Sequence, residues 1–146
     1  AGITVDVSGF TLASGGMFAT LRDIGRIGQL MLNRGMVGDK QVVPSDWMDD
    51  IFNQSGDPDV QYFGLETERL LGAGAKPYYR SFVWGVGDGQ GTVYAAGVHG
   101  QFIYISPSTH TVIAMLSSWP NADGGADGVG SIQAMELLRA IEVAVN

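Results

Sequence analysis

Four runs of β-branched and aromatic residues follow one another in the second half of the chain, with only short connections between them. The runs cover residues 81–87, 92–97, 101–106 and 111–118. Such composition is typical of β-strands. Parallel strands would need a crossover of about a dozen or more residues, and none of these connections is that long. The pattern therefore predicts an antiparallel meander.

Helical signals lie before and after these runs. Thr20 is a favourable N-cap, Asp23 completes a capping box, and Gly35 is a sound C-terminal stop. Pro44 signals a second, shorter helix, and Ser131 is expected to cap a last one. The residues expected to form the apolar faces are Leu21, Ile24, Ile27, Gly28 and Met31, then Trp47, Met48, Ile51 and Phe52, and finally Ile132, Met135, Leu138, Ile141 and Val145.

These patterns predict an α+β fold in a single unit over residues 1–146. Two N-terminal helices precede an antiparallel sheet of about four strands, and a C-terminal helix packs on that sheet. The helical segment covers residues 1–53, and the sheet with its helix covers residues 79–146. Glycine and proline recur between them, so residues 54–78 are expected to form a loop, with at most a short helix near 65–71.

Composition excludes several classes of protein. The net charge is −7 and no stretch concentrates Lys or Arg, which argues against a nucleic-acid partner. No continuous apolar run is long enough to span a membrane, and the first residues lack a signal-peptide pattern. The chain has no cysteine, which excludes disulfides and thiolate chemistry and leaves the redox compartment open.

Motif searches give no support for a metal or an organic cofactor. The two histidines, His99 and His110, are accompanied by no carboxylate cluster at ligand spacing. The glycine-rich residues 72–76 lack P-loop spacing, and the glycines at 85–91 fit no dinucleotide fingerprint. A G-x-S-x-G nucleophile elbow is also missing.

Four segments, in order, resemble the serine β-lactamase-like hydrolases. In residues 15–32 a Gly-Gly turn enters a capped helix that carries an Arg-Asp pair, and residues 42–47 look like the short helix that follows. Residues 97–107 (GVHGQFIYISP) resemble the strand pair beside the active site. Residues 116–120 (LSSWP) are similar to a strand end in the branch that includes 6-aminohexanoate-dimer hydrolases and carboxylesterases.

The resemblance implies acyl transfer from a small-molecule ester or amide, through a Ser-x-x-Lys nucleophile. Lys40 and Lys76 are the only lysines, and neither has a serine three residues before it. The resemblance therefore implies a preceding segment that carries Ser-x-x-Lys and completes the sheet. Without it, an open sheet edge predicts association or a companion segment. Ala95-Ala96-Gly97 replaces the family's Lys-Thr-Gly, which favours an esterase or amidase.

The same resemblance implies the site. The backbone N–H of Val98 would stabilise the acyl oxyanion. Gly97 and Gly100 would let the acyl group approach without a Cβ clash. His99 either bonds a backbone carbonyl or lines the substrate cleft, and Trp119 is expected at the cleft rim.

Two other features have a simpler interpretation. Residues 79–81 (YRS) imitate the family's Tyr-x-Ser motif but lead into a predicted strand. The aromatic residues Tyr78, Tyr79, Phe82, Trp84, Tyr94, Phe102 and Tyr104 are expected to pack on the sheet rather than to form a substrate platform. A non-catalytic binding or structural module with the same core is the alternative function. An unrelated α+β enzyme would need a carboxylate pair, and the sequence shows no convincing one.

Overall fold

The computed structural model describes residues 1–11, 15–53, 61–62, 71, 74–122 and 129–146. Its helices are α1 (Leu21–Leu32), α2 (Ser45–Asn53) and α4 (Val129–Ala144). The main sheet contains, in spatial order, β10 (Thr111–Met115), β9 (Gln101–Ser106), β8 (Val93–Gly97), β7 (Val83–Gly85), β6 (Tyr78–Arg80) and β5 (Gln61–Tyr62). Two small ribbons pair β1 (Gly2–Ile3) with β2 (Met17–Phe18), and β3 (Met36–Val37) with β4 (Lys40–Gln41).

Every pairing in the main sheet is antiparallel, so the predicted meander is confirmed. The prediction of about four strands was too low, because β5 and β6 extend the sheet. The expected strand 81–87 is shorter than predicted, since Ser81 and Phe82 form a two-residue turn between β6 and β7. A turn of this kind usually carries Asn-Gly, so the sequence gives no local signal for it.

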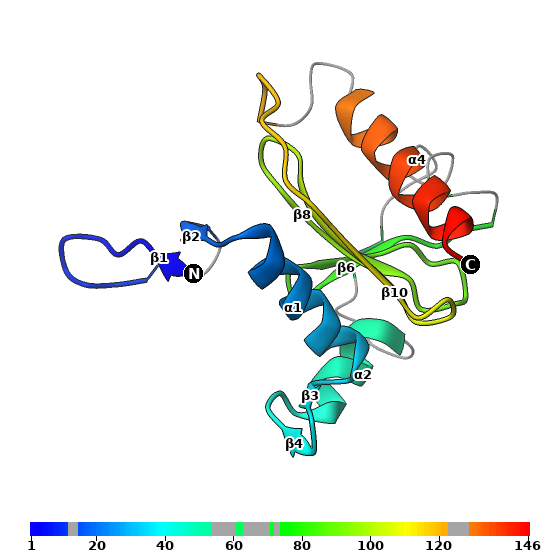
Figure 1. Cartoon of the computed structure of the whole chain (residues 1–146), viewed down its shortest axis with the longest axis horizontal. Helices are drawn as coiled ribbons and strands as arrows, with labels where there is room; N and C mark the ends of the chain where they lie inside the picture. The colour runs from blue at the N-terminus through cyan, green and yellow to red at the C-terminus, as the bar shows by residue number, and fades with distance from the viewer. Residues whose placement is uncertain (12–14, 54–60, 63–70, 72–73, 123–128) are drawn as a thin grey trace.

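The sheet lies between helices on its two faces, and β9 shows this most clearly (Figure 1). Phe102 and Tyr104 point to one face, where they pack with Met135 and Leu138 of α4. Ile105 points to the other face and packs with residues of α1 and α2. The period-two alternation of a strand therefore assigns each helix to its face.

The predicted capping box at the start of α1 is confirmed. Thr20 Oγ1 accepts a hydrogen bond from the Asp23 N–H at 3.2 Å, and Asp23 Oδ2 accepts from the Thr20 N–H at 3.4 Å. At the other end Arg34 adopts a φ of 53°, and the Gly35 N–H reaches back to the Leu30 carbonyl at 2.8 Å. These bonds form a Schellman motif, which stops the helix where Gly35 predicted.

Other boundaries differ from the sequence prediction. Ser131 is the third residue of α4 and not its cap, because the helix already begins at Val129. Trp47, expected on the buried face of α2, is 54% exposed. Val145 lies beyond the end of α4 and is exposed. The helix predicted near residues 65–71 lies, apart from residue 71, outside the described residues. None of the helices described is both long and apolar enough to span a membrane.

Candidate functional site

The predicted site residues gather around the turn of residues 98–100, which joins β8 to β9. Gly97 and Gln101 form the last pair of the ladder before this turn. His99 and Gly100 both adopt positive φ values, 60° and 83°. Trp119 comes from the segment after β10 and lies over the same turn. The structure thus brings together all five residues that the sequence nominated, Gly97, Val98, His99, Gly100 and Trp119.

The backbone at Val98 is open to solvent and to a ligand. Val98 is 66% exposed, and its N–H has no acceptor among the described residues. On its outer side β8 pairs with β7 only at Val93 and Tyr94. Within the described part of the chain, the Ala96–Val98 edge therefore has no strand beside it, and its backbone groups are free to bind.

His99 is held by the segment that follows β10. Its ring Nδ1 lies 2.8 Å from the Trp119 carbonyl oxygen, and its backbone N–H donates to the Ala122 carbonyl at 2.9 Å. A carbonyl oxygen can only accept, so Nδ1 carries a proton and donates in this hydrogen bond. The bond to a backbone carbonyl expected for His99 is present, and the residue is also exposed.

Glycine is needed at position 100 for a different reason from the one predicted. A Cβ there would lie 2.4 Å from Cε2 of the Trp119 indole, and the φ of 83° already favours glycine. Gly100 is buried under this ring, so it admits Trp119 rather than a substrate. At exposed Gly97 a Cβ would meet the Gln101 Cβ at 3.2 Å, which is tight but leaves the outer side of the strand open.

Gln101 is a positioning residue that sequence reasoning did not identify. Its side-chain amide donates to the His99 carbonyl at 3.2 Å and to the Ser117 carbonyl at 2.6 Å. These two bonds hold the turn against the segment that ends in Trp119. A glutamine after a glycine turn gives no local hint of this, because Ser117 is distant in sequence.

A row of aromatic rings leads from β6 to the site. Ring centroids are 4.8 Å apart for Tyr79 and Trp84, 6.1 Å for Trp84 and Tyr94, 6.4 Å for Tyr94 and Phe102, and 6.0 Å for Phe102 and Trp119. Burial raises the pKa of Tyr94 to about 12, so its hydroxyl stays protonated at neutral pH and is no general base. These contacts are sheet packing, and they fix the base of the site.

An apolar cavity of about 220 Å³ borders this row. Trp84, Tyr94, Ala96 and Phe102 from the sheet line it, together with Met135 of α4. Of this lining, Ala96 is the residue nearest in sequence to the Gly97–Val98 pair, and Val98 itself does not line the cavity. A second, more polar cavity of about 270 Å³ is lined by Arg34 and by residues 87–92, at the other end of β8.

Comparisons with known proteins agree with this arrangement. No protein-family model matches the chain. A curated 6-aminohexanoate-dimer hydrolase from Paenarthrobacter ureafaciens is 35% identical over 121 residues, which are 83% of this chain and 30% of that protein. A solved structure of the same hydrolase name, from Bacillus anthracis, has a TM-score of 0.69 and 31% identity over 97% of this chain and 34% of its own. The chain belongs to the β-lactamase-like hydrolases. It spans about a third of the length of these relatives.

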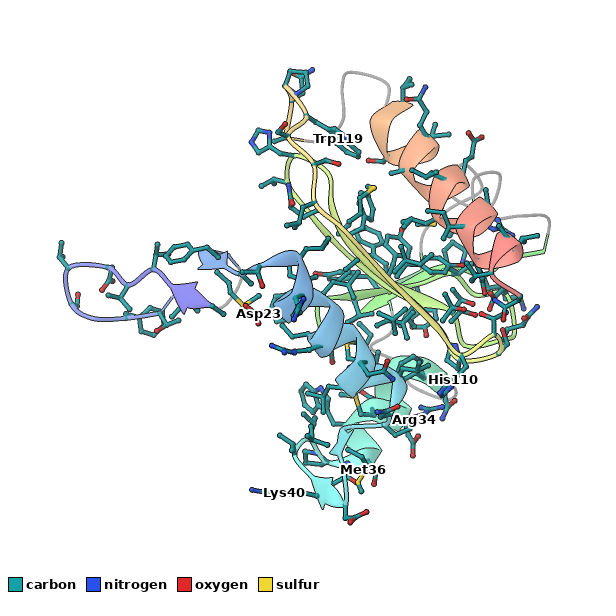
Figure 2. All side chains as sticks on the ribbon, viewed as in Figure 1. Asp23, Arg34, Met36, Lys40, His110 and Trp119 are labelled. Carbon is teal, nitrogen blue, oxygen red and sulfur yellow. The ribbon has the colours of Figure 1, made fainter. Side chains whose placement is uncertain are left out.

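The nucleophile expected of a β-lactamase-like hydrolase is not in this sequence. Positions three before Lys40 and Lys76 hold Val37 and Ala73. Figure 2 shows Lys40 on the β3–β4 ribbon, well away from Trp119. The Tyr-x-Ser imitation at residues 79–81 is built into the β6–β7 hairpin, where the Tyr79 ring packs on Trp84.

The described residues of this β-lactamase-like chain show no metal site. No group of three or more His, Asp or Glu side chains gathers among them. Figure 2 shows His110 at the end of the sheet opposite Trp119, and His99 lies against Trp119. The two histidines therefore cannot act on one ligand.

Proposed function

We propose that this chain is the C-terminal portion of a serine hydrolase that cleaves an ester or amide through an acyl-enzyme. A segment preceding Ala1 carries the Ser-x-x-Lys nucleophile and supplies further strands to the sheet. The substrate is a small molecule, either similar to the 6-aminohexanoate dimer or similar to a β-lactam. Family membership, and the third of a relative's length that the chain spans, support this proposal.

The observation that carries the proposal is the N–H of Val98, which has no acceptor among the described residues and belongs to an exposed residue. When the serine attacks a carbonyl, negative charge develops on the carbonyl oxygen. A backbone N–H stabilises that charge well because it is fixed in place before the charge appears. The hydrogen bonds of His99 and Gln101 hold the turn, so the Val98 N–H needs little rearrangement when the substrate binds.

The surroundings of Val98 suit an uncharged acyl group. Ala95 and Ala96 carry no cationic side chain where many β-lactamases keep a lysine. The apolar cavity beside Ala96 can accept an aliphatic or aromatic portion of the substrate. Trp119 covers the turn and forms one rim of the site. These features favour an ester or an amide over a β-lactam.

The reading frame upstream of Ala1 gives the first test. We expect it to encode Ser-x-x-Lys followed by Tyr-x-Asn or Tyr-x-Ser. If a start codon stands directly before Ala1, the enzyme proposal is wrong and a binding or structural module takes its place.

The second test removes the Val98 N–H from the intact enzyme. Val98→Pro lacks the donor, and we expect kcat to fall by about 10²–10³-fold. Val98→Ala keeps the N–H and serves as the matched control, with a change below about 3-fold. Replacing Val98 by the corresponding α-hydroxy acid removes the N–H without the proline ring, so a folding defect can be separated from a lost donor. Equal activity of the ester-linked variant and the Ala control would contradict the proposed role.

A further inference from the structure

His99 binds the segment after β10 through its side chain as well as its backbone. Its N–H donates to the Ala122 carbonyl at 2.9 Å. Its carbonyl accepts from the Trp119 N–H at 3.2 Å and from the Gln101 side-chain amide, also at 3.2 Å. The ring Nδ1 donates to the Trp119 carbonyl at 2.8 Å. Trp119 is therefore bound to His99 in both directions, by its own N–H and by its carbonyl.

These bonds hold His99 in an uncommon backbone conformation. Its φ is 60°, and the φ of Gly100 is 83°. Histidine adopts this left-handed region more often than most residues do, but the conformation still costs free energy. Such conformations persist where the surrounding structure constrains them, and they cluster at functional sites. The bonds to Trp119 and Ala122 supply that constraint.

The second histidine of the chain provides an internal comparison. His110 also has a positive φ, 56°, in the turn between β9 and β10, and its N–H donates to the Pro107 carbonyl at 3.3 Å. Its ring makes no hydrogen bond to any residue that the structure describes, and it lies at the end of the sheet opposite Trp119 (Figure 2). A histidine turn of this kind therefore does not itself require a bond from the ring.

The bonds of His99 constrain the peptide group that carries the Val98 N–H. On one side of this group, Gly97 pairs with Gln101 in the ladder. On the other side, the His99 N–H is bonded to Ala122. The donor thus lies between two anchored points. Loss of the ring bond would loosen the second anchor and let the donor turn away from its target.

We propose that the ring of His99 is a positioning group for the oxyanion donor, and that it acts by holding the carbonyl of Trp119. This inference rests on the proposed function. The Val98 N–H acts on charge that develops only in the transition state, so the ring governs kcat and leaves KM nearly unchanged. A ring that contacted the substrate would change KM instead.

Two variants of the intact enzyme that lack the ring test the proposal. His99→Gly suits the φ of 60°, so it removes the ring bond without backbone strain, and His99→Leu removes the bond without adding glycine's flexibility. For both we expect kcat on a p-nitrophenyl ester to fall by about 10–100-fold, with KM changed by less than about 3-fold. An initial burst of p-nitrophenol counts the acylated enzyme and corrects kcat for any misfolded fraction.

His99→Asn is the conservative variant. Asparagine tolerates positive φ, and its side-chain amide nitrogen lies the same number of bonds from Cα as Nδ1 does. We expect it to keep kcat within about 3-fold of the wild type. His110→Gly and His110→Leu are the matched controls, because they make the same changes at a similar φ away from the site. We expect both controls to leave kcat unchanged.

A thiono ester provides a readout that a purely structural role would not move. Sulfur accepts hydrogen bonds more weakly than oxygen, so a well-placed oxyanion donor favours the ordinary ester over its thiono analogue. We expect the ratio of the two rates to fall in His99→Gly and His99→Leu. It is expected to stay at the wild-type value in His99→Asn and in the two His110 variants.

The outcomes separate this inference from the proposed function. A higher KM at unchanged kcat would mean that the ring contacts the substrate, and the inference would be wrong. Equal kcat values for His99→Gly and His110→Gly, or an unchanged ratio of ester to thiono ester, would also overturn it. If the intact wild-type protein does not hydrolyse the ester, the proposed function itself fails.

Discussion

Gly28 determines how closely α1 approaches the sheet. A Cβ at this position would lie 2.5 Å from Val112 Cγ1 on β10 and 2.9 Å from Ile103 Cγ2 on β9. Both neighbours are β-branched, and their side chains have few alternative rotamers. Gly25 lies one turn earlier in the same helix and has no atom within 4 Å of its would-be Cβ. Two glycines in one helix therefore have opposite roles.

This contrast predicts opposite effects for the same substitution. Gly28→Ala overpacks the contact between helix and sheet, and we expect a loss of about 1–2 kcal/mol in the free energy of unfolding. Gly25→Ala removes backbone freedom from the unfolded state at no steric cost, and we expect a gain of about 0.5–1 kcal/mol. Urea titration of the two variants measures both values. Equal shifts of the two midpoints would show that α1 does not pack through Gly28.

The site shows which residues a sequence can nominate and which it cannot. Gly97, Val98, His99 and Trp119 fall in short motifs, so their gathering at one turn follows from the resemblance. The role of Gln101 depends on a bond to Ser117, 16 positions away, and no local pattern encodes it. Strong local patterns are visible in a sequence, whereas contacts between distant segments are not.

At the scale of elements, α4 is fastened to the β9–β10 hairpin by one carboxylate. Glu142 accepts hydrogen bonds from the Tyr104 hydroxyl at 2.6 Å and from Thr109 Oγ1 at 2.7 Å. Burial raises the pKa of Glu142, but hydrogen bonds from Ser106, Tyr104 and Thr109 outweigh it and lower the pKa below its ordinary value. The pKa of the Tyr104 hydroxyl is raised by burial and by this bond.

The lowered pKa of Glu142 makes this attachment sensitive to acid. A carboxyl group with a lower pKa in the folded state binds fewer protons there than in the unfolded chain. Its contribution is therefore complete above the unfolded pKa and is lost as the pH falls through the folded value. We expect the free energy of unfolding to decrease as the pH falls below about 4.5.

Glu142→Gln tests the attachment directly. It removes the charged acceptor, and we expect a loss of about 1 kcal/mol at pH 7 and a weaker pH dependence below pH 4.5. Glu136→Gln makes the same charge change at an exposed position of α4 and is the control. We expect the Glu136→Gln variant to retain the wild-type pH dependence of the free energy of unfolding. This includes the part due to Asp6 and Asp23, whose pKa values are also lowered. Identical acid unfolding curves for the two variants would contradict the role of Glu142.

Element boundaries were predictable where local chemistry is strong. The Thr20–Asp23 capping box predicted the start of α1, and β-branched and aromatic composition predicted β9 with the bounds that the structure has. The start of α4 was predicted three residues late, at Ile132 instead of Val129, because Ser131 has the chemistry of a cap but lies inside the helix. The hairpin turn at Ser81 and Phe82 was missed because neither residue is of a type that favours the turn that the two form.

At the scale of the whole molecule, the sheet remains open at its β10 edge. Among the described residues β10 pairs with β9 alone, and Thr111–Met115 include no charge and no proline to block a further strand. α1 and α4 cover the two faces of the sheet and leave this edge available (Figure 1). A preceding segment that contributes strands would pair here, while the Val98 turn faces the opposite side of β9. The proposed companion segment thus has a place in the sheet that does not compete with the site.

The isolated chain is predicted to bind but not to hydrolyse an ester. Among the requirements of the proposed acyl transfer it supplies the oxyanion donor and the apolar surfaces, whereas the nucleophile and its lysine are missing from the sequence. Without the serine and its lysine no acyl-enzyme can form, so we expect the rate of hydrolysis to stay close to that of a denatured control. Release of p-nitrophenol from a p-nitrophenyl ester measures this rate.

Adding the preceding segment in trans is expected to produce hydrolysis, and the same mixture made with the Val98→Pro chain is expected to be about 10²–10³-fold slower. Hydrolysis by the isolated chain well above the denatured control, with an initial burst of p-nitrophenol that marks an acyl-enzyme, would mean that its own residues contain a nucleophile. The assignment of Ser-x-x-Lys to a preceding segment would then be wrong.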